Sequence, residues 1–253
     1  MLSILLLVGV SVTKAQYDPS FSHYYDMETS FNPSAAGRQA YLNVVAAYAM
    51  DMAGYEHNPR TAYVSADMPF RALRSFHGVG VNFMNDQIGL FTHTKLNLQY
   101  AFQMPLFKGH LRLGAEVGFI SEKFDGSQVD LGDSSDPAFS TADLTGSSID
   151  LGAGLFYTHG QWYGGASVHH LNSPLVSLGD NNELKILPTY YFTGGGNISF
   201  RNPFITLKPS LLFRTDGTGW RGDITGRLVY NNGDKMLYIG ATYSPTVSAT
   251  ILL

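Results

Sequence analysis

The residues whose types could carry out chemistry are gathered in one short stretch, Ser167-Val-His169-His170. Serine beside histidine is the pairing used in nucleophilic catalysis, and histidine is the commonest metal ligand. Ser167 and His169 share a face of a strand, but no surrounding motif distinguishes this serine from the others. Neighbouring strand side chains point to opposite faces, so His169 and His170 cannot both reach one metal without distortion. We interpret them as a rim histidine pair at a strand end and predict neither catalysis nor a metal site.

A second candidate site is the acidic segment at 122–147, which carries Asp125, Asp130, Asp133, Asp136 and Asp143 among serine, glycine and threonine. Carboxylate oxygens are the ligands that calcium prefers. The spacing does not match a calcium-binding EF-hand, and acidic polar loops are commonly just solvated. The chain has no cysteine, which excludes a disulfide framework and a zinc–thiolate site. We therefore expect no cofactor and no enzyme activity.

Around these candidates, apolar and polar side chains alternate with a period of two, which is typical of β-strands. In residues 111–119, one face runs from Leu111 to Phe119 through leucine, alanine and valine, and the other carries Arg112, Glu116 and two glycines. Segments 95–103 and 221–230 repeat this alternation. A helix would need apolar residues three and four positions apart, and these segments lack that spacing. The pattern predicts an all-β protein.

Turn-forming residues divide the chain into about twelve strands, at 40–50, 61–70, 76–85, 94–105, 111–121, 148–158, 161–171, 188–200, 204–214, 220–230, 235–243 and 246–253. Most are close to the nine to eleven residues that a tilted strand needs to cross a membrane. Every second connection is tight: 71–75, 107–110, 159–160, 201–203 and 231–234. The connections between them are mostly longer: 51–60, 86–93, 122–147, 172–187 and 215–219, with a very short last one at 244–245. Short periplasmic turns and longer extracellular loops are typical of a transmembrane antiparallel β-barrel.

Composition and the first residues also favour export to a membrane. Charged residues make up 14% of the chain, against about 25% in soluble domains, while aromatic residues reach 13%. The net charge of −4 gives no reason to expect nucleic acid as a partner. The apolar run at 2–12, followed by Ala15, predicts a secretory signal peptide over 1–15, because it is too short to span a bilayer.

Aromatic residues lie near the ends of the expected strands, where they would form the interfacial girdles of a barrel. They are Tyr63, Phe70, Phe83, Phe119, Tyr157, Trp162, Tyr190, Tyr230 and Tyr243. The alternative is that aromatic residues simply favour strands, which explains their presence but not their positions.

The residues following the expected signal peptide carry a family resemblance. Residues 16–24, Gln-Tyr-Asp-Pro-Ser-Phe-Ser-His-Tyr, and 31–37, Phe-Asn-Pro-Ser-Ala-Ala-Gly, resemble the opening of the PorP/SprF family, "QDPxFSQY" followed by "NPAxAG". Residues 65–69, 78–89, 150–157 and 167–174 are similar to that family's "S-x-D-x-P", "GLG…ND…G", "DxGxGxxY" and "SxxHLNxP" stretches. The resemblance covers most of residues 16–253.

This resemblance implies an outer-membrane component of the type IX secretion system, with an accessory role and no cofactor. Its partners would be outer-membrane lipid, other type IX secretion components, and secreted adhesins or cargo proteins. Some relatives in Bacteroidota-type bacteria serve gliding motility. The alternative is a general porin or small-molecule transporter of the outer membrane.

We therefore divide the chain into a signal peptide at 1–15, a lumen-plugging or periplasmic segment at 16–38, and a barrel at 39–253. The family-motif positions that we predict as possible partner contacts are Asp18, Pro19, Phe21, Asn32, Pro33, Gly37, His170, Leu171, Asn172 and Pro174. The chain departs from the family pattern at Tyr17, an insertion, and at residue 253, which no closing segment resembling "GSHEIxLxYxF" follows. With such an end, about fourteen strands would be expected rather than twelve.

Overall fold

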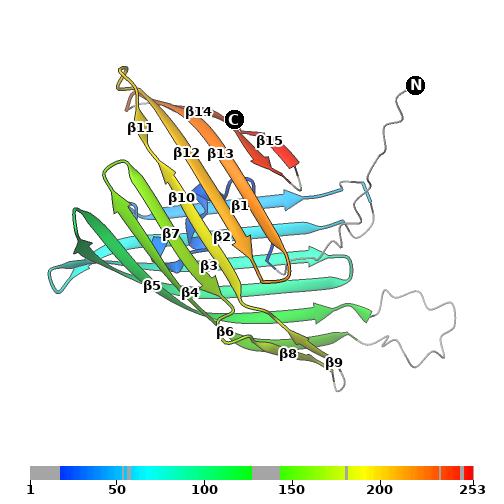
Figure 1. Ribbon diagram of the computed structural model, residues 1–253. Coiled ribbons are helices and arrows are strands. Elements are labelled where there is room, and N and C mark those ends of the chain that lie inside the picture. Colours follow the sequence, from blue (N-terminus) through cyan, green and yellow to red (C-terminus); the bar gives the residue numbers. More distant parts are fainter. Residues whose placement is uncertain are drawn as a thin grey trace, which may run out of the picture.

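A computed structural model describes residues 18–52, 54–55, 58–126, 143–179, 182–233, 235–245 and 248–252. They form one large antiparallel sheet whose strands follow one another in chain order (Figure 1). The strands along it are β1 (Asn43–Met50), β2 (Arg60–Ala72), β3 (Ser75–Ile88), β4 (Phe91–Leu106), β5 (Gly109–Phe124), β6 (Leu144–His159), β7 (Trp162–His169), β10 (Thr189–Gly196), β12 (Ile205–Thr215), β13 (Trp220–Asn231), β14 (Met236–Ser244) and β15 (Ser248–Leu252). The all-β fold and its antiparallel strands confirm the prediction from alternation.

Two short strands were not predicted, and a third, at 198–199, is separated from the rest of the strand predicted at 188–200. β8 (Leu175–Leu178) and β9 (Asn182–Lys185) form a separate hairpin, and β11 (Ile198–Ser199) pairs with β12. The prediction of a loop throughout 172–187 is therefore wrong. Val176 and Ile186 are buried against Ile120 of β5, and this small apolar cluster holds the hairpin against the sheet.

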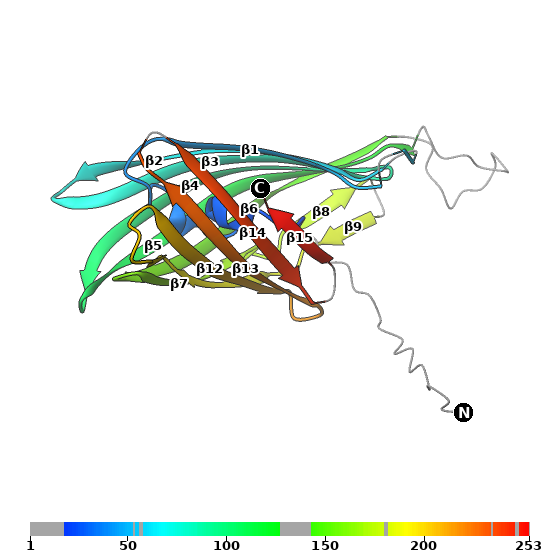
Figure 2. The same cartoon turned by 90° about the horizontal axis from the view of Figure 1, so that it is seen from above.

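The sheet curls around the beginning of the described chain. Figure 2 shows β1 to β4 along one side, β7 and β12 along the other, and the first helical turns between them. These turns are the 3₁₀ helices η1 (Tyr24–Asp26), η2 (Glu28–Ser30) and η3 (Pro33–Ala35). Within the described residues, β1 and β15 are the two edges of the sheet and are not paired with each other. No helix among the described residues is long and apolar enough to cross a membrane.

The two faces of the sheet are inverted relative to a soluble protein. On β5, Leu113, Val117 and Phe119 are 44%, 48% and 51% exposed, whereas Arg112 and Glu116 are only 3% and 5% exposed. The same inversion holds along β4 and β13, where leucine, isoleucine and tyrosine point outward. Charged residues are almost never buried in soluble domains unless paired. An apolar exterior around a polar interior is the arrangement that lipid imposes on a strand-built protein.

Most of the predicted girdle aromatics are exposed, but Tyr63 is not. Phe70, Phe119, Trp162 and Tyr243 are between 38% and 57% exposed on the outer face. Tyr63 is 2% exposed, because odd-numbered residues of β2 point inward. Its assignment to a girdle is therefore wrong.

The connections follow the predicted alternation in part. The connection at 216–219 is no longer than the tight one at 232–235. The three longest, 51–59, 125–143 and 170–188, leave the same end of the sheet. The turns at 73–74, 107–108 and 160–161 lie at the opposite end, called here the tight-turn end. The long connection predicted at 86–93 is wrong, because β3 and β4 continue to a turn at 89–90.

If the outer face meets lipid, a charge placed at its middle should destabilise the fold strongly. Val117 lies at the middle of β5, and Val117→Arg is expected to lower the free energy of unfolding by about 2–4 kcal/mol. Urea unfolding in phospholipid vesicles measures this change. Asn202→Arg, in an exposed turn, is the matched control. Equal losses for the two variants would contradict a lipid-facing exterior.

Candidate functional site

The candidate site is the contact between residues 18–38, called here the N-terminal segment, and the polar inner face of the sheet. The 3₁₀ turns of the segment leave carbonyl groups without partners of their own. Strand side chains supply the missing donors. Arg112 donates from Nε to the carbonyl of Ser34 at 2.9 Å and also to that of Ala36, and Asn82 donates to the carbonyl of Thr29 at 2.7 Å. The segment is therefore held by its backbone.

Glycines in the strands make room for this backbone. A Cβ atom added to Gly78 would lie 1.9 Å from the carbonyl oxygen of Ala36, and one added to Gly114 would lie 2.2 Å from the amide nitrogen of Ser34. Both distances are far below van der Waals contact. The segment and the sheet fit each other only because these positions lack side chains.

The Asn32-Pro33 pair and Gly37 shape the end of the segment. Asn32 is fully buried; its Oδ1 accepts from the Ser34 amide at 3.0 Å and caps η3, while its Nδ2 donates to the Leu155 carbonyl at 3.1 Å. Pro33 takes the first helical position, where a missing N–H costs nothing. Gly37 has a φ of +65°, and its amide donates to Asp67 Oδ2 at 2.8 Å.

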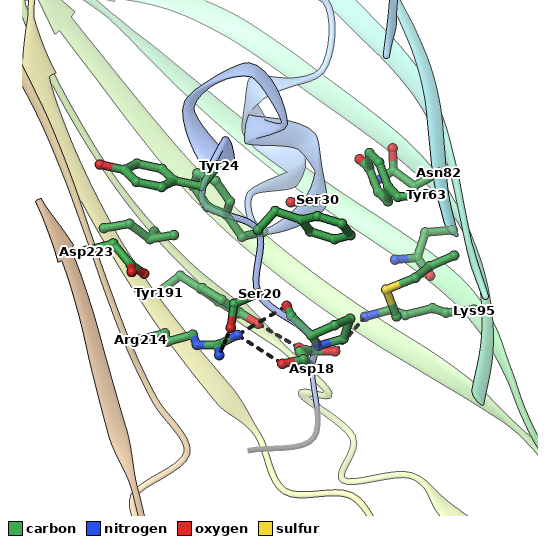
Figure 3. A pocket seen from close by; sticks show the side chains of 16 residues that line it. Asp18, Ser20, Tyr24, Ser30, Tyr63, Asn82, Lys95, Tyr191, Arg214 and Asp223 are labelled. Carbon is green, nitrogen blue, oxygen red and sulfur yellow. Dashed lines mark hydrogen bonds and ion pairs between the residues drawn. The ribbon is translucent and has the colours of Figure 1, made fainter. Parts of the chain in front are cut away.

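Asp18 anchors the other end of the segment (Figure 3). Tyr191 Oη donates to its Oδ2 at 2.6 Å, His170 Nε2 lies 3.3 Å from both carboxylate oxygens, and Lys95 Nζ lies 3.9 Å from Oδ1. Arg214 donates to the carbonyl of Asp18 at 2.9 Å and to that of Pro19 at 3.2 Å. Asp18 thus joins β4, β10, β12 and the connection after β7.

Phe21 adds an apolar contact, with its ring 6.0 Å from that of Tyr63. A cavity of about 50 Å³ lies between the N-terminal segment and the strands, with room for only a few water molecules.

Behind Asp18 lies a second layer of buried charges. Lys95 Nζ is 3.4 Å from Asp150 Oδ2 and 3.3 Å from His169 Nδ1. His169 Nδ1 is also 3.0 Å from Glu116 Oε1, and His170 Nδ1 is 3.0 Å from Asp150 Oδ1. These five residues and Asp18 form the buried ion cluster. Each of its three carboxylates lies within 4 Å of a lysine or histidine side chain, which offsets part of the cost of burying it.

The cluster sets the ionisation of Asp18. Burial by itself raises the pKa of this carboxyl group, because it disfavours the charged form. Lys95 and His170 outweigh burial and hold the pKa of Asp18 well below its usual range. Asp18 is therefore a carboxylate at neutral pH.

The histidine pair does not obey strand alternation. Both side chains are fully buried, and their ring centroids are 6.3 Å apart. β7 ends at His169, and His170 has a φ of +55°, which turns its ring toward the interior as well. The interpretation as a rim pair on opposite faces is therefore wrong. Ser167 donates to the carbonyl of Phe31 and so serves the N-terminal segment. Within the described ranges, no group of three His, Asp or Glu side chains is arranged to hold a metal ion.

Comparison with known families decides what kind of protein carries this site. A family model described as type IX secretion system membrane protein PorP/SprF matches residues 13–253. The chain belongs to the PorP/SprF family. It is therefore a membrane component of type IX secretion, and the resemblance read from its motifs is confirmed. No curated protein and no solved structure matches the chain.

The stretch at 170–174, which resembles the PorP/SprF "HLNxP" stretch, combines three structural tasks. His170 binds Asp18. Asn172 pairs with the edge of β6 where β7 has ended: its Nδ2 donates to the Ile149 carbonyl at 2.7 Å, and its Oδ1 accepts from the Leu151 amide at 3.1 Å. Pro174 accepts from the Ile186 amide at 3.0 Å and begins the β8–β9 hairpin.

Leu171 is 54% exposed and takes no part in the cluster. Its backbone amide donates to the carbonyl of Leu151 at 2.8 Å. All of the motif positions thus contact other parts of the chain, and their role in binding a partner stays a prediction.

The expected signal peptide lies outside the described residues, as do Asp130, Asp133 and Asp136 of the acidic connection. At the edge of that connection, Asp143 forms an exposed ion pair with Lys123 at 3.1 Å.

Four functional residues were not predicted: Lys95, Arg112, Tyr191 and Arg214. Each is nearly fully buried on the inner face. Lys95 and Arg112 are on the polar face of their strands in the sequence pattern. A basic residue at such an inward-facing position could have indicated that it binds a group in the interior.

Proposed function

We propose that the protein is an outer-membrane component of the type IX secretion system that supports export or surface attachment of secreted proteins. The observation that carries this proposal is an apolar-outside sheet whose polar interior is occupied by the protein's own N-terminal segment. An interior filled in this way favours a docking role over free passage of solutes. The description of the family as a secretion-system membrane protein favours a protein that is not an enzyme.

In this proposal, the tight-turn end faces the periplasm and the long connections face the cell surface, as in other barrels of the outer membrane. The partners are outer-membrane lipid, other type IX secretion components, and secreted adhesins or cargo proteins. Surface adhesins would connect the protein to gliding motility.

Deletion of the gene tests the role in secretion. We expect loss of type IX cargo from the medium and cell surface, restored by the wild-type gene. The tagged protein should fractionate with outer membranes and change its gel mobility on heating, as folded barrels do. Unchanged secretion in the deletion strain would refute the proposed role, and recovery as a soluble monomer without detergent would refute the location.

A porin is the second candidate, because the interior is not filled everywhere. A cavity of about 680 Å³ lies between the N-terminal segment and β1. It is lined by Pro19 to His23, Asp26 and Met27 on one side and by Val45 to Ala49 on the other. Steady ion conductance of the purified protein in planar bilayers would support the porin. Near silence would support a docking protein with a plugged lumen.

A further inference from the structure

The most exposed large apolar side chains in the described chain stand on two hairpin tips. Leu73, between β2 and β3, and Phe107, between β4 and β5, are each 93% exposed. Both tips belong to the tight-turn end, on the left in Figure 1, where the two hairpins project. Because these are the large apolar side chains most exposed to water, a partner that covered them would gain hydrophobic free energy.

Backbone geometry makes these residues poor choices for a turn alone. Leu73 has a φ of +48°, Arg74 of +65° and Phe107 of +52°, in the left-handed region that glycine and asparagine adopt readily. Two-residue hairpins strongly favour Asn-Gly at such positions. Leucine and phenylalanine here do not serve the turn, and an unfavourable conformation of this kind is often kept for function.

Charge adds a second, independent feature. Within two residues of the connections at the tight-turn end, the described lysine and arginine side chains are Arg71, Arg74, Lys108, Arg201 and Lys235, all exposed, and no described aspartate or glutamate accompanies them. Asp234 lies outside the described residues. The opposite end mixes the two signs, with Asp51, Asp125, Glu183 and Asp216 beside Lys123 and Lys185. The tight-turn end is thus a basic surface with two apolar projections.

We propose that Leu73, Arg74, Phe107 and Lys108, called here the docking tips, bind a protein whose surface has apolar pockets surrounded by carboxylates. The proposal rests on the proposed function in placing these tips in the periplasm. Anionic lipid would also attract basic residues. However, β2 to β5 have 13 to 16 residues, more than the nine to eleven or so that cross a membrane, so these strands extend past the hydrocarbon. The exposed charges of Arg71, Arg74 and Lys108 favour the tight-turn end as the end that lies outside it. A protein partner explains apolar tips outside the bilayer, and lipid does not.

Site-specific photo-crosslinking in living cells tests the docking tips. Benzoylphenylalanine replaces Leu73 or Phe107 in the full-length protein, and Ile224, on the lipid-facing side of β13, in the control. We expect both tips to give an adduct with the same protein, through a peptide rich in aspartate and glutamate, and the control to give none. Arg74→Glu with Lys108→Glu should reduce this adduct at least tenfold. Three results would overturn the proposal. They are adducts with lipid alone, adducts with a different protein at each tip, and adducts whose yield does not change on charge reversal.

A second variant separates binding from folding. Leu73→Asn with Arg74→Gly installs the residues that the turn prefers, so the hairpin should be at least as stable while the adduct from position 107 falls severalfold. Unchanged heat-modifiability on gels shows that the barrel is intact. Binding of the purified protein to phosphatidylglycerol vesicles, compared with phosphatidylcholine vesicles, tests the lipid alternative; loss of vesicle binding in the charge-reversed variant together with an absent protein adduct would favour lipid. If deletion of the gene leaves secretion normal, while the full-length protein still gives the adduct when it is present, the proposed function is refuted and the docking-tip proposal stands.

Discussion

Gly114→Ala is expected to expel the N-terminal segment from the interior while the sheet remains folded. The added Cβ would lie 2.2 Å from the Ser34 amide nitrogen and 2.4 Å from its Cα. Both are backbone atoms, so no side-chain rotation relieves the clash, and η3 has to move away from β5. Gly114 pairs with Ala101 and Gly154 in the sheet, which alanine leaves undisturbed.

Thiol labelling measures this displacement cleanly, because the chain has no cysteine of its own. In a Ser30→Cys background, Gly114→Ala should raise the rate of maleimide labelling roughly tenfold or more, since overpacking costs about 1–3 kcal/mol. Gly226→Ala in β13 is the matched control, because nothing lies within 4 Å of its added Cβ. Equal labelling rates in the two variants would show that the segment does not depend on close contact with β5.

Alternation predicted the strands well, because an exterior facing lipid and a polar interior keep the period of two intact over many residues. The same inversion explains the wrong loop at 86–93. Polar residues there suggested solvent, but Asp86 is an inward residue of β3 that accepts a hydrogen bond from Thr61 at 2.6 Å. Where the interior is polar, polarity no longer separates a loop from a strand. The β8–β9 hairpin was missed because each strand has only four residues, too few for alternation to be recognised, and those of β9 are all exposed.

The site was predictable only in part. Motif resemblance singled out Asp18, Asn32 and His170, all of which lie in the interior. It did not indicate that Asp18 and His170 meet, since 152 positions separate them and only the curling of the sheet brings them together. The buried position of both histidines depends on the positive φ of His170, a local backbone choice that alternation does not reveal.

Asp18→Asn should weaken the binding of the N-terminal segment to the inner face of the sheet. We expect a larger effect than from removing any other single charge of that segment. The variant keeps the size of the side chain but leaves Lys95 and His170 without one carboxylate. Removing one partner of a buried ion pair costs about 3–5 kcal/mol, and we expect about 3 kcal/mol because Lys95 keeps Asp150 at 3.4 Å. Urea unfolding of the folded protein in lipid vesicles at neutral pH measures the loss.

The pH dependence of this loss of stability tests whether it comes from the charge of Asp18. Its pKa is lowered in the folded protein, so its stabilising contribution is complete above the unfolded value of about 4 and is lost as the pH falls below it. The difference between wild type and Asp18→Asn should therefore be constant near neutral pH and shrink below about pH 4. Asp26→Asn is the control, because Asp26 is half exposed and its pair with Arg227 at 3.3 Å should contribute about 1 kcal/mol or less. A difference that persisted unchanged at low pH would show that Asp18 acts by shape and hydrogen bonding rather than by charge.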